Sequence, residues 1–367
     1  MGCIGRPYNR AMLIEGIFAA ISTPFYPDGR VYYRKIEANM ARYSRTLLSG
    51  VVVLGSTGEA PMLTDAESAG VLRCAAAAAA PEKVLIAGIG RESVRATLEL
   101  AEEATRAHYD AVLVRPPSYY ESLRTDAAQL HYFRSVADRS PLPVLLYNVP
   151  KCVPIEIPVA VVAELAAHPN IIGIKDSSGS VERIKAQVEA TRNAPRRTET
   201  VTPIFEAVTG RMLAPKTGQG ETGQGGAFVS AGELAGGAAV ATAPPAPALK
   251  TRTREVGFQV LCGAGSIVLE SLEAGACGAV LAVAAFAPEA SQEIYIAWKD
   301  HDLKLAAEKQ ERVARVHRKI VGEIGIGGVK YACDFNGYFG GHPRSPLVAP
   351  TAAVKAEIEA LLADTRN

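Results

Sequence analysis

The stretch IIGIKDSS, residues 171–178, decides the fold because it ends a buried strand with a lysine. Its isoleucines, Ile171, Ile172 and Ile174, indicate a strand buried on both faces, which is typical of parallel sheets. Lys175 closes this strand, and burial of an unpaired ammonium costs several kcal/mol. Burial also favours the neutral amine, which can attack a carbonyl carbon to form a Schiff base. We therefore weigh two hypotheses for Lys175: a lysine held by partners, or a nucleophile.

Seven further apolar runs alternate with helical segments along the chain. They begin at Ile17, Val51, Lys83, Ala111, Pro143, Phe258 and Gly278, and helices are expected over residues 64–80, 92–107, 126–137, 158–167 and 181–192. Eight such units predict an α/β fold, a closed (β/α)₈ TIM barrel. Residues 289–321 and 352–362 predict additional C-terminal helices. We expect an N-terminal extension over residues 1–15, the barrel over 16–288 and a C-terminal helical region over 289–367.

A low-complexity segment at about residues 195–257 interrupts the barrel pattern. It is rich in Gly, Ala, Thr and Pro and has no apolar periodicity, so we expect a disordered insertion. Its GxGxxG triplet (Gly218, Gly220, Gly223) follows no strand and precedes no helix, which argues against dinucleotide binding. The segment joins the sixth helix to the seventh strand, at the barrel face opposite the catalytic rim. Its composition is also typical of translated non-coding sequence, so its presence in the native protein is left open.

The composition narrows the classes of partner and compartment. Lys and Arg total 39 against 38 Asp and Glu, without a polybasic block, so neither nucleic acid nor an anionic membrane is an expected partner. Six scattered cysteines favour neither a disulfide framework nor a metal site, and fit a reducing compartment. The longest apolar stretch, residues 276–287, is too short to span a bilayer. We expect a cytoplasmic protein, and a short leader to an organelle such as the mitochondrion is left open.

Polar side chains follow several strands at what would be one rim of the barrel. Ser56 and Thr57 lie between two glycines, Tyr147 ends the fifth strand, and Tyr119 follows the fourth. Each alone has an ordinary interpretation, as a tight turn or a packed tyrosine. Together with Lys175 they converge on the rim where barrel enzymes do their chemistry. An amine, a phenol that moves protons and an anion-binding turn are the groups that cleavage of a 2-oxo acid requires.

Three motifs carry a resemblance to a known family. GSTGE (residues 55–59), YNVP (147–150) and IIGIKDSSG (171–179) resemble, in order and spacing, the pyruvate-dependent class I aldolases that include dihydrodipicolinate synthase, N-acetylneuraminate lyase and 4-hydroxy-2-oxoglutarate aldolase. The resemblance spans residues 16–362 apart from the insertion. The tail VKYACDFNGYFGGHPRSPL (329–347), with RPPSYY (115–120), is most similar to the 4-hydroxy-2-oxoglutarate aldolase branch.

The resemblance implies a role for each rim residue. Lys175 would be the Schiff-base lysine and Tyr147 the proton relay, with no metal and no other cofactor. The pyruvate carboxylate would bind Ser56 and Thr57, and Tyr119 would reach the site of a neighbouring subunit. The remaining implied pocket positions are Ser177, Gly263 and Val280. Family members are commonly tetramers of tight dimers, so we expect a homotetramer or a homodimer.

Departures from the family pattern bear on the substrate. Synthases usually read YNVPxR, and here Cys152 takes the place of that arginine. A thiol cannot make the bidentate contact that a guanidinium makes with a carboxylate. Gly263-Ala264-Gly265, after the seventh strand, lacks the acidic pair common in bacterial synthases. We therefore expect an aldolase that releases pyruvate from 4-hydroxy-2-oxoglutarate. Alternatives are an aldolase for 2-keto-3-deoxy sugar acids, dihydrodipicolinate synthase, or an inactive barrel with a binding role.

Overall fold

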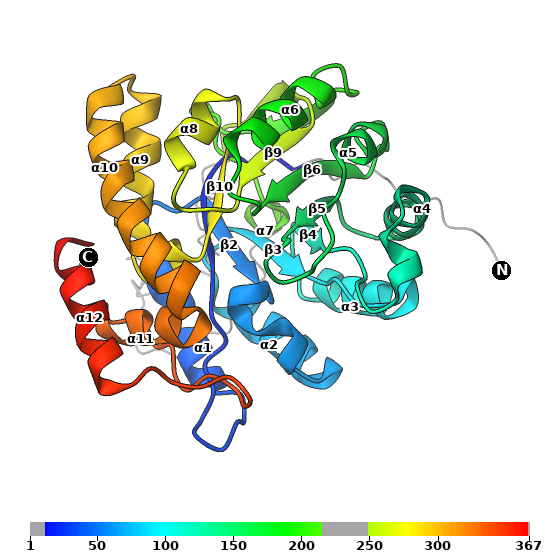
Figure 1. Ribbon diagram of the computed structural model, residues 1–367. Coiled ribbons are helices and arrows are strands. Elements are labelled where there is room, and N and C mark those ends of the chain that lie inside the picture. Colours follow the sequence, from blue (N-terminus) through cyan, green and yellow to red (C-terminus); the bar gives the residue numbers. More distant parts are fainter. Residues whose placement is uncertain (1–11, 215–248, 366–367) are drawn as a thin grey trace, which may run out of the picture.

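Eight parallel strands close into a barrel in the computed structural model, which describes residues 12–214 and 249–365 (Figure 1). Their order around the barrel is β1, β10, β9, β6, β5, β4, β3, β2. The bounds are Gly16–Ala20 (β1), Gly50–Val53 (β2), Val84–Gly88 (β3), Ala111–Val114 (β4), Val144–Asn148 (β5), Ile171–Asp176 (β6), Gln259–Cys262 (β9) and Gly278–Leu281 (β10). Every predicted strand is present, so the predicted (β/α)₈ barrel is confirmed.

Helices surround the barrel, and several begin where the sequence offers a capping hydroxyl. The bounds are Tyr33–Tyr43 (α1), Asp65–Ala78 (α2), Val94–Arg106 (α3), Asp126–Ala137 (α4), Val159–Leu165 (α5), Val181–Thr191 (α6) and Val268–Glu273 (α8). Thr64, Ser93, Thr125 and Ser180 each accept a backbone N–H of the first turn that follows. Thr64 and Glu67 form a complete capping box. These caps fix where each helix leaves the rim.

Two apolar layers hold the barrel together. The inner layer fills the barrel with side chains that include Phe18, Leu113, Leu145 and Tyr147. The outer layer packs the opposite strand faces against the helices. Because side chains alternate along a strand, Leu146 faces the helices whereas Tyr147 faces the interior. This alternation directs the strand-end residues towards the barrel axis.

The C-terminal region contains more helices than predicted. Residues 289–321 do not form one helix: Pro288–Lys299 (α9) and Leu303–Val316 (α10) are separate, and a π-helix spans His317–Ile324. The break occurs where His301 has a φ of 61° and Asp302 caps α10. Ile326–Phe335 (α11) was not predicted, whereas Ala352–Leu362 (α12) was. Figure 1 shows α9–α12 grouped on one side of the barrel, with α11 beside α1.

The expectation of disorder over residues 195–257 is wrong at both ends. Arg197–Val201 (β7) and Arg252–Val256 (β8) form an antiparallel ribbon, and Gly210–Leu213 (α7) follows β7. Local periodicity could not reveal this ribbon, because its two strands lie about 50 residues apart in the sequence. The GxGxxG triplet and the rest of residues 215–248 lie outside the described residues.

The ribbon lies at the expected end of the barrel. Arg211 donates to the carbonyl of Lys83 and pairs with Asp110, residues that precede β3 and β4. Met12, Leu13 and Ile14, which fall in the predicted N-terminal extension, are also buried. Gln259 bonds both the N–H and the carbonyl of Ile14. Within the described ranges, no helix is long and apolar enough to cross a membrane.

Candidate active site

Lys175 and Tyr147 lie side by side inside the barrel. The two residues are opposite each other in the β5–β6 pairing, and their exposed fractions are only 4% and 6%. The Lys175 Nζ lies 4.3 Å from the centroid of the Tyr147 ring, close enough for a cation–π contact when the amine is protonated. Among the described residues, no carboxylate lies within ion-pairing distance of this Nζ. For the first hypothesis, a lysine held by partners, the described structure offers the Tyr147 ring but no acidic partner.

The turn after β2 approaches this pair from the next part of the rim. Ser56–Gly58 forms a single 3₁₀ turn, and the Ser56 Oγ lies 3.4 Å from the Tyr147 Oη. Both flanks of the turn are strained, because Leu54 and Glu59 have φ values of 60° and 55°. Thr57 is buried within the turn. The turn between these flanks places the Ser56 hydroxyl beside the phenol.

Asp176, the residue after Lys175, fixes the end of β6. Its Oδ2 accepts hydrogen bonds from Asn148 Nδ2 (2.9 Å), Arg183 Nε (2.8 Å) and Gln187 Nε2 (2.7 Å). Its Oδ1 accepts from the N–H of Ser178 at 2.9 Å. Since Asp176 faces the helices, Lys175 faces the barrel interior. The network therefore holds the lysine's backbone without contacting its amine.

Another buried lysine, Lys330, contacts the residue that ends the Ser56 turn. Lys330, on α11, is fully buried and forms an ion pair with Glu59, which ends the turn. Its Nζ also donates to the carbonyl of Thr23 at 2.8 Å, and Thr23 donates to the carbonyl of Gly58. Burial lowers the pKa of Lys330, and Glu59 opposes that effect. The C-terminal region thus holds the turn that carries Ser56 and Thr57.

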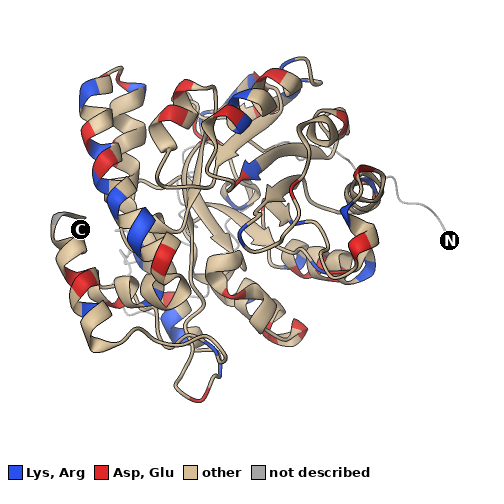
Figure 2. Cartoon of the chain, in the orientation of Figure 1, with Lys and Arg blue, Asp and Glu red and all other residues tan. Residues whose placement is uncertain are grey.

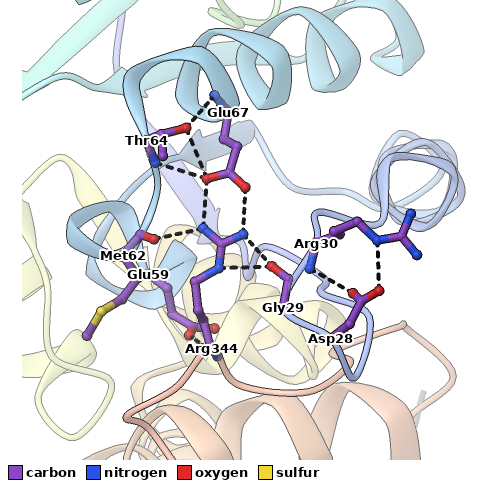
Figure 3. Close-up of polar contacts among 8 residues, drawn as sticks. All are labelled: Asp28, Gly29, Arg30, Glu59, Met62, Thr64, Glu67 and Arg344. Carbon is purple, nitrogen blue, oxygen red and sulfur yellow. Dashed lines mark hydrogen bonds and ion pairs between the residues drawn. The ribbon is translucent and has the colours of Figure 1, made fainter.

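Arg344 extends this support, as Figure 3 shows. Its backbone N–H donates to Glu59 Oε2 at 2.8 Å, and its guanidinium binds both oxygens of Glu67 at 2.7 and 2.8 Å. The guanidinium also donates to the carbonyls of Gly29 and Met62. The Arg344 guanidinium is the main cause that holds the pKa of Glu67 down at about 2. The motif at residues 329–347 thereby connects β1, the Ser56 turn and α2.

A cavity of about 480 Å³ opens at the rim above β2 to β5. Of the residues predicted from the sequence, Ser56, Tyr147 and Cys152 line it, and Cys152 is exposed. Three charged residues that sequence reasoning did not assign also line it: Arg91, Glu92 and Arg115. Figure 2 shows that most other charges of both signs lie on the outer helices. The cavity therefore combines the phenol, a hydroxyl and a charged wall.

The other predicted positions lie around the end of β6 or outside the cavity. Ser177 lies against Gly263, where the Cβ of any larger residue would lie 1.9 Å from the Ser177 Oγ, so only glycine fits there. Val280 is buried in the inner layer. Tyr119 is 79% exposed and packs edge-to-face on Tyr120. The barrel thus gathers Lys175, Tyr147, Ser56 and Ser177 at one end, whereas Tyr119 is exposed and does not line the cavity.

His317 supports the end of β9 and was not predicted. Its Nδ1 accepts a hydrogen bond from the N–H of Gly265 at 3.2 Å. Burial, with smaller contributions from Lys151 and Arg318, lowers its pKa to about 4. The imidazole is therefore neutral at pH 7 and can accept that bond. Within the described residues, no group of three His, Cys, Asp or Glu side chains could hold a metal ion.

Comparison with known proteins identifies the family. The model of the dihydrodipicolinate synthetase family matches residues 13–195 and 247–365. The chain belongs to this family. Residues 196–246, which the family model does not match, fall within the predicted insertion. As a member of the dihydrodipicolinate synthetase family, the protein is a pyruvate-dependent carbon–carbon lyase of the class I aldolase type.

Relatives within the family carry two different names. A 4-hydroxy-tetrahydrodipicolinate synthase of Acidiphilium cryptum is 28% identical over 95% of this chain and 98% of its own. An Emericella nidulans protein named "Probable 4-hydroxy-2-oxoglutarate aldolase, mitochondrial" is 38% identical over 48% of this chain and 59% of its own. Among solved structures, dihydrodipicolinate synthase from Acinetobacter baumannii superposes with a TM-score of 0.75 at 24% identity, covering 96% of this chain and 99% of that one. The last comparison supports the fold alone.

Proposed function

We propose that the protein cleaves 4-hydroxy-2-oxoglutarate to pyruvate and glyoxylate through a Schiff base on Lys175. The observation that carries the proposal is the environment of Lys175: a buried amine beside a phenol, with no acidic partner among the described residues. Within the described residues, no ion pair therefore holds this amine away from a substrate ketone. It is thereby suited to act as a nucleophile.

The proposed reaction begins at the substrate ketone. The amine of Lys175 adds to C2, and the C2 oxygen takes a proton from the Tyr147 phenol and leaves as water. This gives a Tyr147 phenolate and an iminium, which accepts electrons from the neighbouring bond. Tyr147, as phenolate, takes the proton of the C4 hydroxyl while the C3–C4 bond breaks. Glyoxylate leaves, and the electron pair of that bond forms an enamine. Protonation at C3 and addition of water then release pyruvate and restore the amine.

Ser56 and Thr57 are proposed to bind the carboxylate at C1. The strained turn places the Ser56 hydroxyl 3.4 Å from the Tyr147 oxygen, so a bound carboxylate would lie near the reacting carbon. Backbone N–H groups of such turns are ready-made donors for anions. Ser177, Gly263 and Val280 are proposed to line the pocket on the side of β6, β9 and β10.

Cys152 favours the aldolase over the synthase. It is an exposed thiol on the cavity wall, at the position where synthases usually carry a carboxylate-binding arginine. The second candidate is nevertheless 4-hydroxy-tetrahydrodipicolinate synthase, because relatives of that name match nearly the whole chain. The third is an aldolase for 2-keto-3-deoxy sugar acids.

We also propose that the chain forms a homodimer or homotetramer. Tyr119 and Tyr120 are 79% and 64% exposed on the loop after β4. Large exposed aromatic side chains are typical of interfaces. In this proposal, Tyr119 reaches the site of a neighbouring subunit. Sedimentation of the wild type and of the Tyr119→Ser variant tests it: unchanged association would contradict this placement.

Borohydride trapping tests the central claim. Reduction in the presence of pyruvate is expected to add the mass of one reduced pyruvate to the peptide that contains Lys175. Absence of that increment, or its appearance on another lysine, would refute the proposal and would favour the inactive barrel. Cleavage of 4-hydroxy-2-oxoglutarate is then compared with condensation of pyruvate and aspartate semialdehyde and with cleavage of 2-keto-3-deoxy sugar acids. Faster condensation would favour the synthase.

A further inference from the structure

Arg115 contributes the charged wall of the cavity and has no role in the proposed reaction. It follows β4 directly, and its side chain is 21% exposed. A Cβ built at Gly90 would lie 2.5 Å from the Arg115 Cγ. The absence of a side chain at Gly90 therefore lets the arginine stem cross the end of β3. Gly90, Arg115 and Tyr147 all line the cavity.

Glu92 holds this guanidinium in place. Its Oε1 lies 2.9 Å from Arg115 Nη2, and its Oε2 accepts from the N–H groups of Ser118 (2.8 Å) and Tyr119 (3.0 Å). Burial opposes ionisation of Glu92, but these N–H groups and Arg115 outweigh it and lower its pKa. The carboxylate is thus a fixed anchor, charged at neutral pH, for both the loop and the arginine.

Arg115 retains the capacity to bind an anion in this arrangement. Its Nη1 donates to the carbonyl of Pro116 at 2.9 Å, and its Nη2 faces Glu92. A guanidinium has five N–H donors in a rigid plane, so it can keep both contacts and still donate to another carboxylate. Arg91 adds a second guanidinium to the lining, although its Nη2 donates to Ser68 on α2. The lining therefore contains two arginines against one glutamate.

We propose that Arg115 binds a second carboxylate of the substrate, at the end remote from the Schiff base. The inference rests on the proposed function, because it places the 2-oxo group at Lys175. Ser56 and Tyr147 line the same cavity as Arg115, and Tyr147 lies opposite Lys175 in the β5–β6 pairing, so the cavity joins the neighbour of the proposed nucleophile to the guanidinium. Cys152, on the same cavity, cannot supply that cation. In this proposal, the residue that selects a 2-oxo dicarboxylic acid is Arg115 at the end of β4, not a residue of the loop after β5.

Borohydride trapping with two acids of equal length tests Arg115 without requiring turnover. 2-Oxoglutarate and 2-oxopentanoate both offer a ketone at C2 and a five-carbon chain, but only the first has a second carboxylate. We compare the concentration for half-maximal trapping of each acid in the wild type, in Arg115→Gln and in Arg115→Lys. Arg134→Gln is the matched control, because Arg134 pairs with Glu164 on the outer helices. Pyruvate is trapped in parallel.

The wild type is expected to prefer 2-oxoglutarate over 2-oxopentanoate by about 10- to 100-fold, as a charge-assisted bidentate contact allows. Arg115→Gln is expected to remove that preference, Arg115→Lys to keep part of it, and both to trap pyruvate like the wild type. A wild type without preference, or an Arg115→Gln variant that keeps it, would overturn the role of Arg115. Failure of pyruvate trapping in the wild type would instead overturn the proposed function. If the Arg115→Gln variant alone failed to trap pyruvate, the Arg115→Lys variant would decide the question. Normal trapping of pyruvate by Arg115→Lys, together with an unchanged preference for 2-oxoglutarate, would refute a role of Arg115 limited to the remote carboxylate.

Discussion

Lys175 and Lys330 are two of the three buried lysines among the described residues, and their surroundings differ; the third, Lys83, donates to the carbonyls of Thr46 and Leu48. Lys330 forms an ion pair with Glu59 and donates to the carbonyl of Thr23. Lys175 lies over the ring of Tyr147, and no carboxylate among the described residues pairs with it. A buried ammonium needs such partners to offset the loss of hydration. The ion pair thus gives Lys330 a structural role, whereas the absence of such a pair at Lys175 among the described residues supports the proposal that this amine is the nucleophile.

The same substitution at the two lysines should separate these roles. Lys175→Met is expected to lower kcat by at least about 10⁴-fold, because the nucleophile is lost. Its free energy of unfolding should stay within about 1 kcal/mol of the wild type, since no carboxylate loses a partner. Steady-state kinetics and urea denaturation measure the two quantities. Lys175→Arg with full turnover would contradict the proposed mechanism, since a guanidinium does not act as a neutral nucleophile.

Lys330→Met should have the opposite profile. It leaves Glu59 buried without its cation, so the free energy of unfolding should fall by about 3–5 kcal/mol. The double variant Lys330→Met with Glu59→Gln should recover part of that loss, because the uncompensated charge is removed. Urea denaturation of the two single variants and the double variant measures the coupling. Purely additive losses would show that the pair does not act as a unit.

Tyr147→Phe tests whether the ring and the hydroxyl beneath Lys175 have separate roles. The ring still packs against the amine, but the proton relay is lost, so kcat should fall by about 10²- to 10⁴-fold. Schiff-base trapping with pyruvate should persist. Steady-state kinetics and mass spectrometry check the two halves. An unchanged kcat would assign the proton transfer to another group.

Glu67→Gln removes the ion pair between Glu67 and Arg344 and has the smallest expected effect. Glutamine preserves the capping box with Thr64 but removes the charge that Arg344 binds. The pKa of Glu67 is about 2 in the folded protein against an ordinary value of 4.5, so its contribution is present above pH 4.5 and is lost as the pH falls towards 2. The variant should be about 1 kcal/mol less stable at pH 7 and should lose less stability between pH 5 and pH 3. An equal loss of stability between pH 5 and pH 3 in the wild type and in Glu67→Gln would contradict this prediction.

Local sequence patterns predicted the structural features that depend on residues close together in the chain. All eight barrel strands were found from short apolar runs, and the positions of Lys175 and Tyr147 at strand ends followed from them. Contacts distant in sequence were not visible in this way. Lys330 is 271 residues from Glu59, and β7 pairs with a strand about 50 residues later. The wall formed by Arg115 and Glu92 was missed because Glu92 belonged to no motif and Arg115 entered only as the first residue of RPPSYY, with no role assigned to its side chain.

The ribbon of β7 and β8 closes a loop in the sense of polymer physics. Val201 lies opposite Arg252, so the ribbon brings together the two ends of the segment that joins its strands. The entropy cost of a closed loop rises only with the logarithm of its length, by about 0.6 kcal/mol for each doubling. The ribbon, together with α7, which contacts the barrel through Arg211, therefore fixes the barrel end of this segment whatever number of residues follows α7. Insertions and deletions after α7 should therefore change the stability of the catalytic rim little.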